Sequence, residues 1–217
     1  MTTTASVSAL ACRLPCDHNG EVILRIFVMA QRFTSLEPKH LDFIARQHVF
    51  FTASATATGH INLSPRSTDM FRVLDPNRVV YLDRTGSGNE TAAHLLADGR
   101  LTIMLCAFDG PPLIMRLYGA GRTIRRGTEE YQNLLTAHFA GTEPLGARQM
   151  VLLTFDLVQT SCGYGVPLQD YVGERPTMDR WAEAKGPAGI EAYWHEKNVV
   201  SLDGFPTGLF ETAGPAE

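Results

Sequence analysis

Residues 100–124, RLTIMLCAFDGPPLIMRLYGAGRTI, contain two apolar segments separated by the turn sequence DGPP. Segments of this kind on either side of a short turn predict a β-hairpin. Further β-type segments occur at residues 48–54, 60–65, 70–74, 78–83 and 148–160. Because turns rather than regular crossover helices join most of them, the sequence predicts a mainly β, antiparallel barrel rather than a doubly wound sheet.

The composition excludes several functional classes. A chain of 217 residues fits one domain, and 44% hydrophobic with 19% charged residues is typical of a soluble globular protein. The net charge of −4 argues against a nucleic-acid partner, which usually selects a basic surface. No apolar run approaches the roughly 20 residues needed to cross a membrane. We therefore expect a cytoplasmic protein with neither nucleic acid nor membrane as a partner.

The first 28 residues are small, polar and weakly patterned, and they lack the basic start of a secretory signal. We expect them to be a flexible tail or an over-called start, followed by one domain over residues 29–217. Cys12, Cys16 and His18 lie close together in this tail, but a zinc site normally needs a second, well-spaced ligand pair. No metal site is therefore predicted.

Residues 83–96, DRTGSGNETAAHLL, connect a predicted strand to a predicted helix over residues 89–97. Ser87 and Glu90 have the spacing of a capping box, which is enough to explain a plain turn and helix start. The same glycines and backbone N–H groups could instead cradle an anion. Glu90 would repel a phosphate there, so an anion site would need a cation from elsewhere in the chain.

The segment HINLSPRS, residues 60–67, offers such a cation. Alternation along a strand places Asn62, Ser64 and Arg66 on one face, and Pro65 favours an edge strand. A guanidinium and a hydroxyl on one face are suited to binding a phosphate. A solvent-facing strand surface is the alternative interpretation.

Together these two segments resemble the pyridoxamine 5′-phosphate oxidase-like flavoproteins, in the branch with an NLSP[KR] strand followed by GSGNET. The resemblance continues through QTSCGYGVP and NVVSLDGFPTG, and so covers residues 34–208. It implies a split antiparallel β-barrel of Greek-key type with flanking helices, which forms a homodimer and holds FMN at the subunit interface. The implied cofactor-binding residues are Asn62, Leu63, Ser64, Arg66, Thr85, Ser87, Gly88 and Asn89.

The resemblance implies an FMN-dependent oxidoreductase that acts on a small molecule, with NADH or NADPH as a possible electron donor. No catalytic residue is assigned, because the flavin ring itself accepts electrons. The chain lacks the basic stretch and the C-terminal signature of the vitamin-forming oxidases, which argues against pyridoxamine phosphate as the substrate. The alternative is a protein on the same fold that binds or carries flavin, deazaflavin or haem without turnover.

Overall fold

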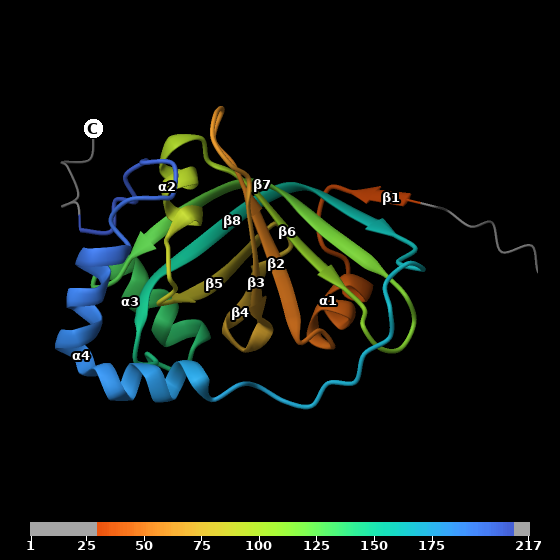
Figure 1. The fold of residues 1–217 in the computed structure, drawn as a ribbon. Coiled ribbons are helices and arrows are strands. Elements are labelled where there is room, and N and C mark those ends of the chain that lie inside the picture. The colour runs from red at the N-terminus through yellow and green to blue at the C-terminus, as the bar shows by residue number, and fades with distance from the viewer. Residues whose placement is uncertain (1–29, 211–217) are drawn as a thin grey trace, which may run out of the picture.

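The predicted hairpin lies in the middle of one curved antiparallel sheet (Figure 1). The computed structural model describes residues 30–210. Its strands are β1 (Ala30–Phe33), β2 (Val49–Ser54), β3 (Asn62–Ser67), β4 (Phe71–Asp75), β5 (Arg78–Arg84), β6 (Arg100–Cys106), β7 (Ile114–Arg125) and β8 (Ala147–Ser161).

The strand order is β3-β2-β6-β7-β8-β5-β4, with β1 pairing to β8. Hairpins join neighbours such as β6 and β7, whereas β2 lies beside β6 and β5 beside β8. The two longest strands, β7 and β8, pair from end to end and curl with the sheet (Figure 1). The expectation of a mainly β, split antiparallel barrel with flanking helices is therefore confirmed.

Within residues 30–210, four α-helices flank the sheet: α1 (Pro38–Ala45), α2 (Glu90–Ala97), α3 (Glu129–His138) and α4 (Thr177–Lys197). Phe43 and Ile44 of α1 join the larger core with Leu95 of α2. α3 covers a second core on the other side of the sheet, around Tyr131 and Met150. No helix between residues 30 and 210 has both the length and the apolar character required to cross a membrane.

The sequence predicts a helix from about residue 36, because Thr34 and Glu37 have capping-box spacing and Pro38 suits a first turn. The helix instead begins at Pro38, and Glu37 rather than Thr34 is its N-cap. The reciprocal partner is His40, whose Nδ1 accepts the Glu37 backbone N–H at 3.0 Å. Thr34 lies before the helix, where its carbonyl accepts a hydrogen bond from Asn77. The core therefore receives the face that carries His40 and Phe43, and leaves Leu41 exposed.

β3 is an edge strand, as Pro65 predicted. It pairs with β2 in a regular register in which Asn62 faces Ser54 and Arg66 faces Phe50. The side chain of Leu63 is 64% exposed, whereas its neighbours Asn62 and Ser64 are half-buried. The polar residues of β3 therefore share the face that turns toward α2.

The C-terminal part of the chain returns to α2 (Figure 1). Residues 162–176 contain neither helix nor strand, and the sequence CGYGVPLQDY at residues 162–171 predicts a loop there. The sequence also predicts two short helical runs, around residues 178–184 and 190–196. Both lie in α4, and the kink that separates them is at Gly186 with φ 64° and ψ 170°. The boundary that we predict between residues 28 and 29 falls outside the described residues, and so do Cys12, Cys16 and His18.

Gly119 provides a test of the sheet geometry, because the β7–β8 register shifts between Tyr118 and Gly119. A Cβ at Gly119 would overlap the Thr154 carbonyl oxygen and lie 2.6 Å from Phe155 Cα. Backbone atoms cannot move aside as a flexible side chain can. We expect Gly119→Ala to lower the free energy of unfolding by about 2–3 kcal/mol in urea denaturation.

Gly165→Ala is the matched control, because a Cβ at Gly165 has no heavy atom within 4 Å. It should change the free energy of unfolding by less than about 0.5 kcal/mol. Equal stability of the two variants would mean that the sheet does not hold Gly119 against Phe155.

Candidate functional site

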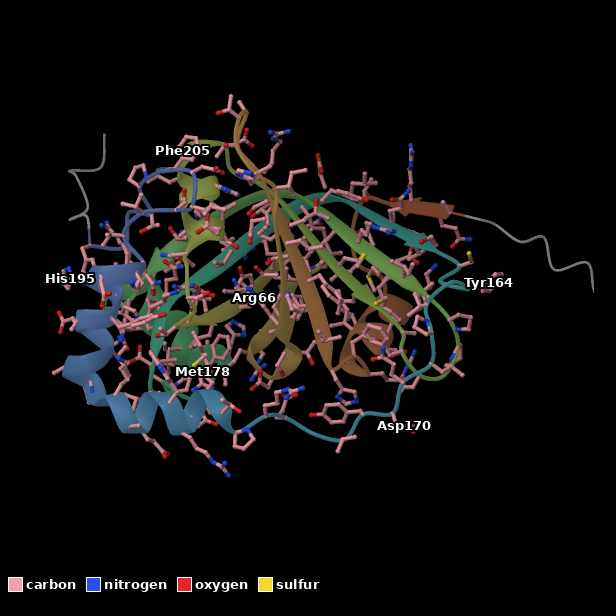
Figure 2. All side chains as sticks on the ribbon, viewed as in Figure 1. Arg66, Tyr164, Asp170, Met178, His195 and Phe205 are labelled. Atoms are coloured by element: carbon pink, nitrogen blue, oxygen red, sulfur yellow. The ribbon has the colours of Figure 1, made fainter. Side chains whose placement is uncertain are left out.

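A cavity of about 830 Å³ lies between the polar face of β3 and the turn that joins β5 to α2. The start of α4 and residues 200–202 complete its walls. Arg66 and Met178 of α4 both line this cavity. In Figure 2 the label of Arg66 is near the middle of the view, and that of Met178 is below it and to the left. Among the predicted cofactor-binding residues, those that line the cavity are Asn62, Ser64, Arg66, Thr85, Ser87 and Gly88.

Leu63 and Asn89 do not line this cavity. Leu63 projects from the opposite face of β3. Asn89 is 2% exposed, and its side-chain oxygen accepts a hydrogen bond from Gln149 Nε2 at 2.8 Å. The geometry thus gives Asn89 a structural role, in which it joins the start of α2 to β8.

Arg66 is held in place by two neighbours on β5. Its Nη1 donates to Asp83 Oδ1 at 2.5 Å, and its guanidinium carbon lies 4.8 Å from the centre of the Tyr81 ring. Burial raises the pKa of Tyr81 to about 12, so this ring is neutral at physiological pH. Burial lowers the pKa of Arg66, but Tyr81 and Asp83 outweigh it and the net shift is upward. Arg66 therefore remains charged at the cavity wall.

Asp83 is shared by two arginines. Its second oxygen accepts hydrogen bonds from Arg148 Nε at 2.8 Å and from Gln149 Nε2 at 2.9 Å. Burial alone would raise the pKa of Asp83, but Arg148 and Arg66 reverse this and lower it. Two guanidinium groups on one carboxylate leave one net positive charge beside the cavity.

The sequence analysis missed both Asp83 and Arg148. They lie at the end of β5 and near the start of β8, two apolar strands that pair with each other. A charged residue at the end of a buried strand is the one signal that could have found them. Their partners come from strands far apart in sequence, so that signal does not identify the pairing.

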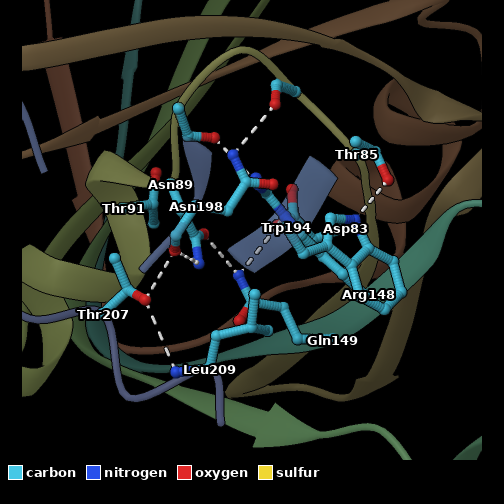
Figure 3. A network of polar contacts seen from close by, with 12 residues as sticks. Asp83, Thr85, Asn89, Thr91, Arg148, Gln149, Trp194, Asn198, Thr207 and Leu209 are labelled. Atoms are coloured by element: carbon cyan, nitrogen blue, oxygen red, sulfur yellow. Dashed lines mark hydrogen bonds and ion pairs between the residues drawn. The ribbon is translucent and has the colours of Figure 1, made fainter. Parts of the chain in front are cut away.

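The turn between β5 and α2 is held from outside rather than by its own capping box (Figure 3). Arg148 Nη1 donates to the Gly88 carbonyl at 2.8 Å, and Asn198 Nδ2 donates to the Gly86 carbonyl at 3.1 Å. Trp194 Nε1 donates to Thr85 Oγ1 at 2.7 Å. α4 and the residues that follow it therefore fix the shape of this turn.

The capping box predicted for Ser87 and Glu90 is wrong. The N-cap of α2 is Asn89, and Ser87 lies exposed before it. The Glu90 carboxylate instead accepts the Leu202 backbone N–H, at 3.1 and 3.0 Å to its two oxygens. The C-terminal segment supplies this donor, which only the tertiary structure brings to Glu90.

Comparison with known proteins identifies the family of this chain. The family model described as pyridoxamine 5′-phosphate oxidase matches residues 36–162. The pyridoxamine 5′-phosphate oxidase family protein ustO of Aspergillus flavus is 38% identical in an alignment of 191 residues that covers 80% of this chain and 76% of that protein. The chain belongs to the pyridoxamine 5′-phosphate oxidase family.

Solved structures with similar folds include two that bind different cofactors. The FAD binding protein from Mycobacterium smegmatis is 17% identical, with a TM-score of 0.41 over 59% of this chain and 96% of its own. The haem storage protein HutZ from Vibrio cholerae is 15% identical, with a TM-score of 0.41 over 56% of this chain and 92% of its own.

The metal-binding capacity of the described residues is also limited. Among residues 30–210, no three His, Cys, Asp or Glu side chains are grouped so that they could hold a metal ion. The cations at the cavity wall are arginine and lysine side chains instead, namely Arg66, Arg84, Arg148, Arg175 and Lys197. Such groups bind anions rather than metals.

Removal of one partner of the buried Asp83–Arg148 pair should destabilise the protein. Arg148→Met leaves the Gly88 carbonyl without this donor and Asp83 with Arg66 alone as its cation. We expect the free energy of unfolding in urea to fall by about 3–5 kcal/mol. Arg122→Met is the control, because Arg122 and Glu130 form an exposed pair whose loss should cost about 0–1 kcal/mol.

Asp83 should also make stability depend on pH. Because folding lowers its pKa, the stabilisation is fully present above the unfolded pKa of about 3.9 and is lost as pH falls through the lower folded value. Between about pH 4 and pH 2, the free energy of unfolding of the wild type should therefore fall more steeply than that of Asp83→Asn. Parallel pH profiles, measured by urea denaturation, would contradict this assignment.

Proposed function

We propose that this protein is an FMN-dependent oxidoreductase, with its flavin in the 830 Å³ cavity and the FMN phosphate near Arg66 and the turn of residues 85–88. The observation that carries the proposal is the meeting of this turn with the polar face of β3 in one cavity. These segments are distant in sequence and share no strand pairing. Membership of the pyridoxamine 5′-phosphate oxidase family also supports the proposal of an FMN site.

The residues present fit a flavin phosphate. The cavity volume lies in the range of about 300–1,000 Å³ that is usual for small-molecule sites. The Arg66–Asp83–Arg148 cluster adds one net positive charge, and its arginines are held rigidly before any ligand arrives. The sequence analysis predicts that Glu90 would repel a phosphate at this turn. In the structure the Glu90 carboxylate accepts a hydrogen bond from the Leu202 N–H.

When bound, FMN would supply the electron-accepting ring. Arg66 would bind the phosphate, and the Ser87 hydroxyl and the backbone of residues 86–88 would orient it. Thr85 would shape the turn rather than donate to the phosphate, because its hydroxyl and its backbone N–H both donate to the Gly146 carbonyl at 2.8 Å, and the hydroxyl also accepts from Trp194. The protein's task is thus to hold and orient the cofactor, and we assign no acid or base.

We also propose that the protein forms a homodimer with FMN at the subunit interface. Val200 and Leu202 line the cavity, yet 49% and 78% of their surfaces are exposed. Leu63, on the outer face of β3, is likewise exposed. A second subunit that covers Val200 and Leu202 would close the cavity. The NAD(P)H donor, the cytoplasmic location and the exclusion of pyridoxamine phosphate as substrate stay predictions.

The direct test is an absorbance spectrum of the purified protein, with the cofactor released by heat and identified by mass. FMN in the released fraction, together with reduction of the bound flavin by NADH or NADPH, would support the proposal. Bound FMN that no donor reduces would favour a flavin carrier. Haem, a deazaflavin, or no uptake of added FMN would overturn the assignment of FMN.

Arg66→Ala should weaken FMN binding by on the order of 1.5–3 kcal/mol, since a charge-assisted phosphate contact is lost. Fluorescence quenching of FMN measures this, with thermal unfolding in parallel because Arg66 also binds Asp83. Arg78→Ala is the control, because its partner Asp75 lies outside the cavity lining. An FMN affinity equal to that of the control would remove Arg66 from the site.

A further inference from the structure

A chain of hydrogen bonds runs from a buried histidine to the cavity wall. His94 of α2 is 1% exposed, and its Nδ1 lies 3.1 Å from Ser54 Oγ of β2. Asn62 Nδ2 donates to Ser54 Oγ at 3.3 Å and to Thr91 Oγ1 at 3.0 Å. Ser64 Oγ donates to Asn62 Oδ1 at 3.0 Å. Asn62 and Ser64 line the cavity, whereas His94 does not.

Both amide hydrogens of Asn62 are therefore engaged within the protein. Each has an acceptor, and the oxygen has one donor. Asn62 thus has no N–H group left to donate to a ligand. Asn62 affects the cavity indirectly, because its oxygen accepts a hydrogen bond from the Ser64 hydroxyl.

Ser64 is left with a defined polarity. A serine hydroxyl has one hydrogen and two lone pairs, and the hydrogen points to Asn62. The oxygen that faces the cavity then accepts a hydrogen bond and does not donate one. If the Asn62 amide were turned over, its NH₂ group would face Ser64, and Ser64 would become a donor to the cavity.

His94 determines which orientation is stable. With Asn62 donating to Ser54, the Ser54 hydrogen needs an acceptor, and His94 Nδ1 is the one within reach. This requires neutral His94 with its hydrogen on Nε2, a buried atom that has no hydrogen-bond partner among the described residues. The other tautomer would donate from Nδ1 to Ser54 Oγ, and the Ser54 hydrogen would then need the oxygen of a turned-over Asn62 amide. The tautomer of His94 and the orientation of the Asn62 amide therefore change together, and the orientation in the structure corresponds to hydrogen on Nε2.

We propose that His94 acts through Ser54 and Asn62 as a positioning residue, which makes Ser64 a hydrogen-bond acceptor for the ligand in the cavity. The proposal rests on the proposed function and specifies it further. The ligand must carry an N–H or O–H group at Ser64 and an anion near Arg66, two residues or about 6.7 Å away along β3. A phosphorylated molecule with hydroxyl or imide groups, such as FMN, has both.

The first part of the test needs no ligand. Long-range ¹H–¹⁵N correlation of the labelled protein identifies the protonated ring nitrogen of His94. We expect a neutral ring with hydrogen on Nε2. Protonation of Nδ1 would overturn the proposed polarity, whether or not the protein binds flavin.

The second part compares FMN with riboflavin, which lacks the phosphate. Ser64→Ala should weaken both by about three- to tenfold, because the lost hydrogen bond does not involve the phosphate. Arg66→Ala should instead weaken FMN far more than riboflavin. Unchanged affinity of Ser64→Ala for both flavins would overturn the role of Ser64 and leave the proposed function intact. If the wild type binds neither flavin, the proposed function fails, while the His94 tautomer still decides the polarity.

Two variants of His94 test its role. His94→Leu removes the acceptor of the Ser54 hydrogen and permits the Asn62 amide to turn over, so flavin affinity should fall as in Ser64→Ala. His94→Asn places a carbonyl oxygen near the position of Nδ1 and should restore most of the affinity. Equal affinities of the two variants, at comparable thermal stability, would show that His94 only fills space.

Discussion

The carboxylate of Asp83 is the group on which the rest of the site depends. It binds Arg66 of β3 through one oxygen, and Arg148 and Gln149 of β8 through the other. Its side chain is only 1% exposed, so an unpaired charge there would be very costly. Full pairing ties the edge strand β3 to β5 and β8, at the other end of the strand order. It also keeps both guanidinium groups in place beside the cavity.

This cluster extends into the C-terminal segment (Figure 3). Arg148 binds the side-chain oxygen of Asn198 at 2.8 Å, and the Asn198 backbone oxygen accepts the Thr207 hydroxyl at 2.7 Å. The chain beyond the region matched by the family model therefore completes the turn at the cavity. Local sequence in that turn would cap a helix, but the shape it adopts depends on residues more than 50 positions away.

Patterns that operate within one element were predictive. Alternation in NLSPRS correctly placed Asn62, Ser64 and Arg66 on one face, and Pro65 correctly indicated an edge strand. The site itself was less predictable, because the partners of these residues lie elsewhere. The sequence predicts that Asn62 binds the cofactor, yet its amide forms hydrogen bonds with Ser54, Thr91 and Ser64. The Ser87–Glu90 spacing was a false signal, because Leu202 offers Glu90 a better-placed donor.

By itself, the sequence determined the class of fold and the location of the two segments that meet at the cavity. Hydrophobic alternation and turn residues act over a few positions, so they are legible without coordinates. Only the tertiary structure decided which charges pair and which polar atoms face the cavity. Those outcomes depend on desolvation and on donors from β8, α4 and residues 198–209, which no local pattern encodes. The Asp83–Arg148 pair is one such outcome, because a buried charge is stable only with a partner.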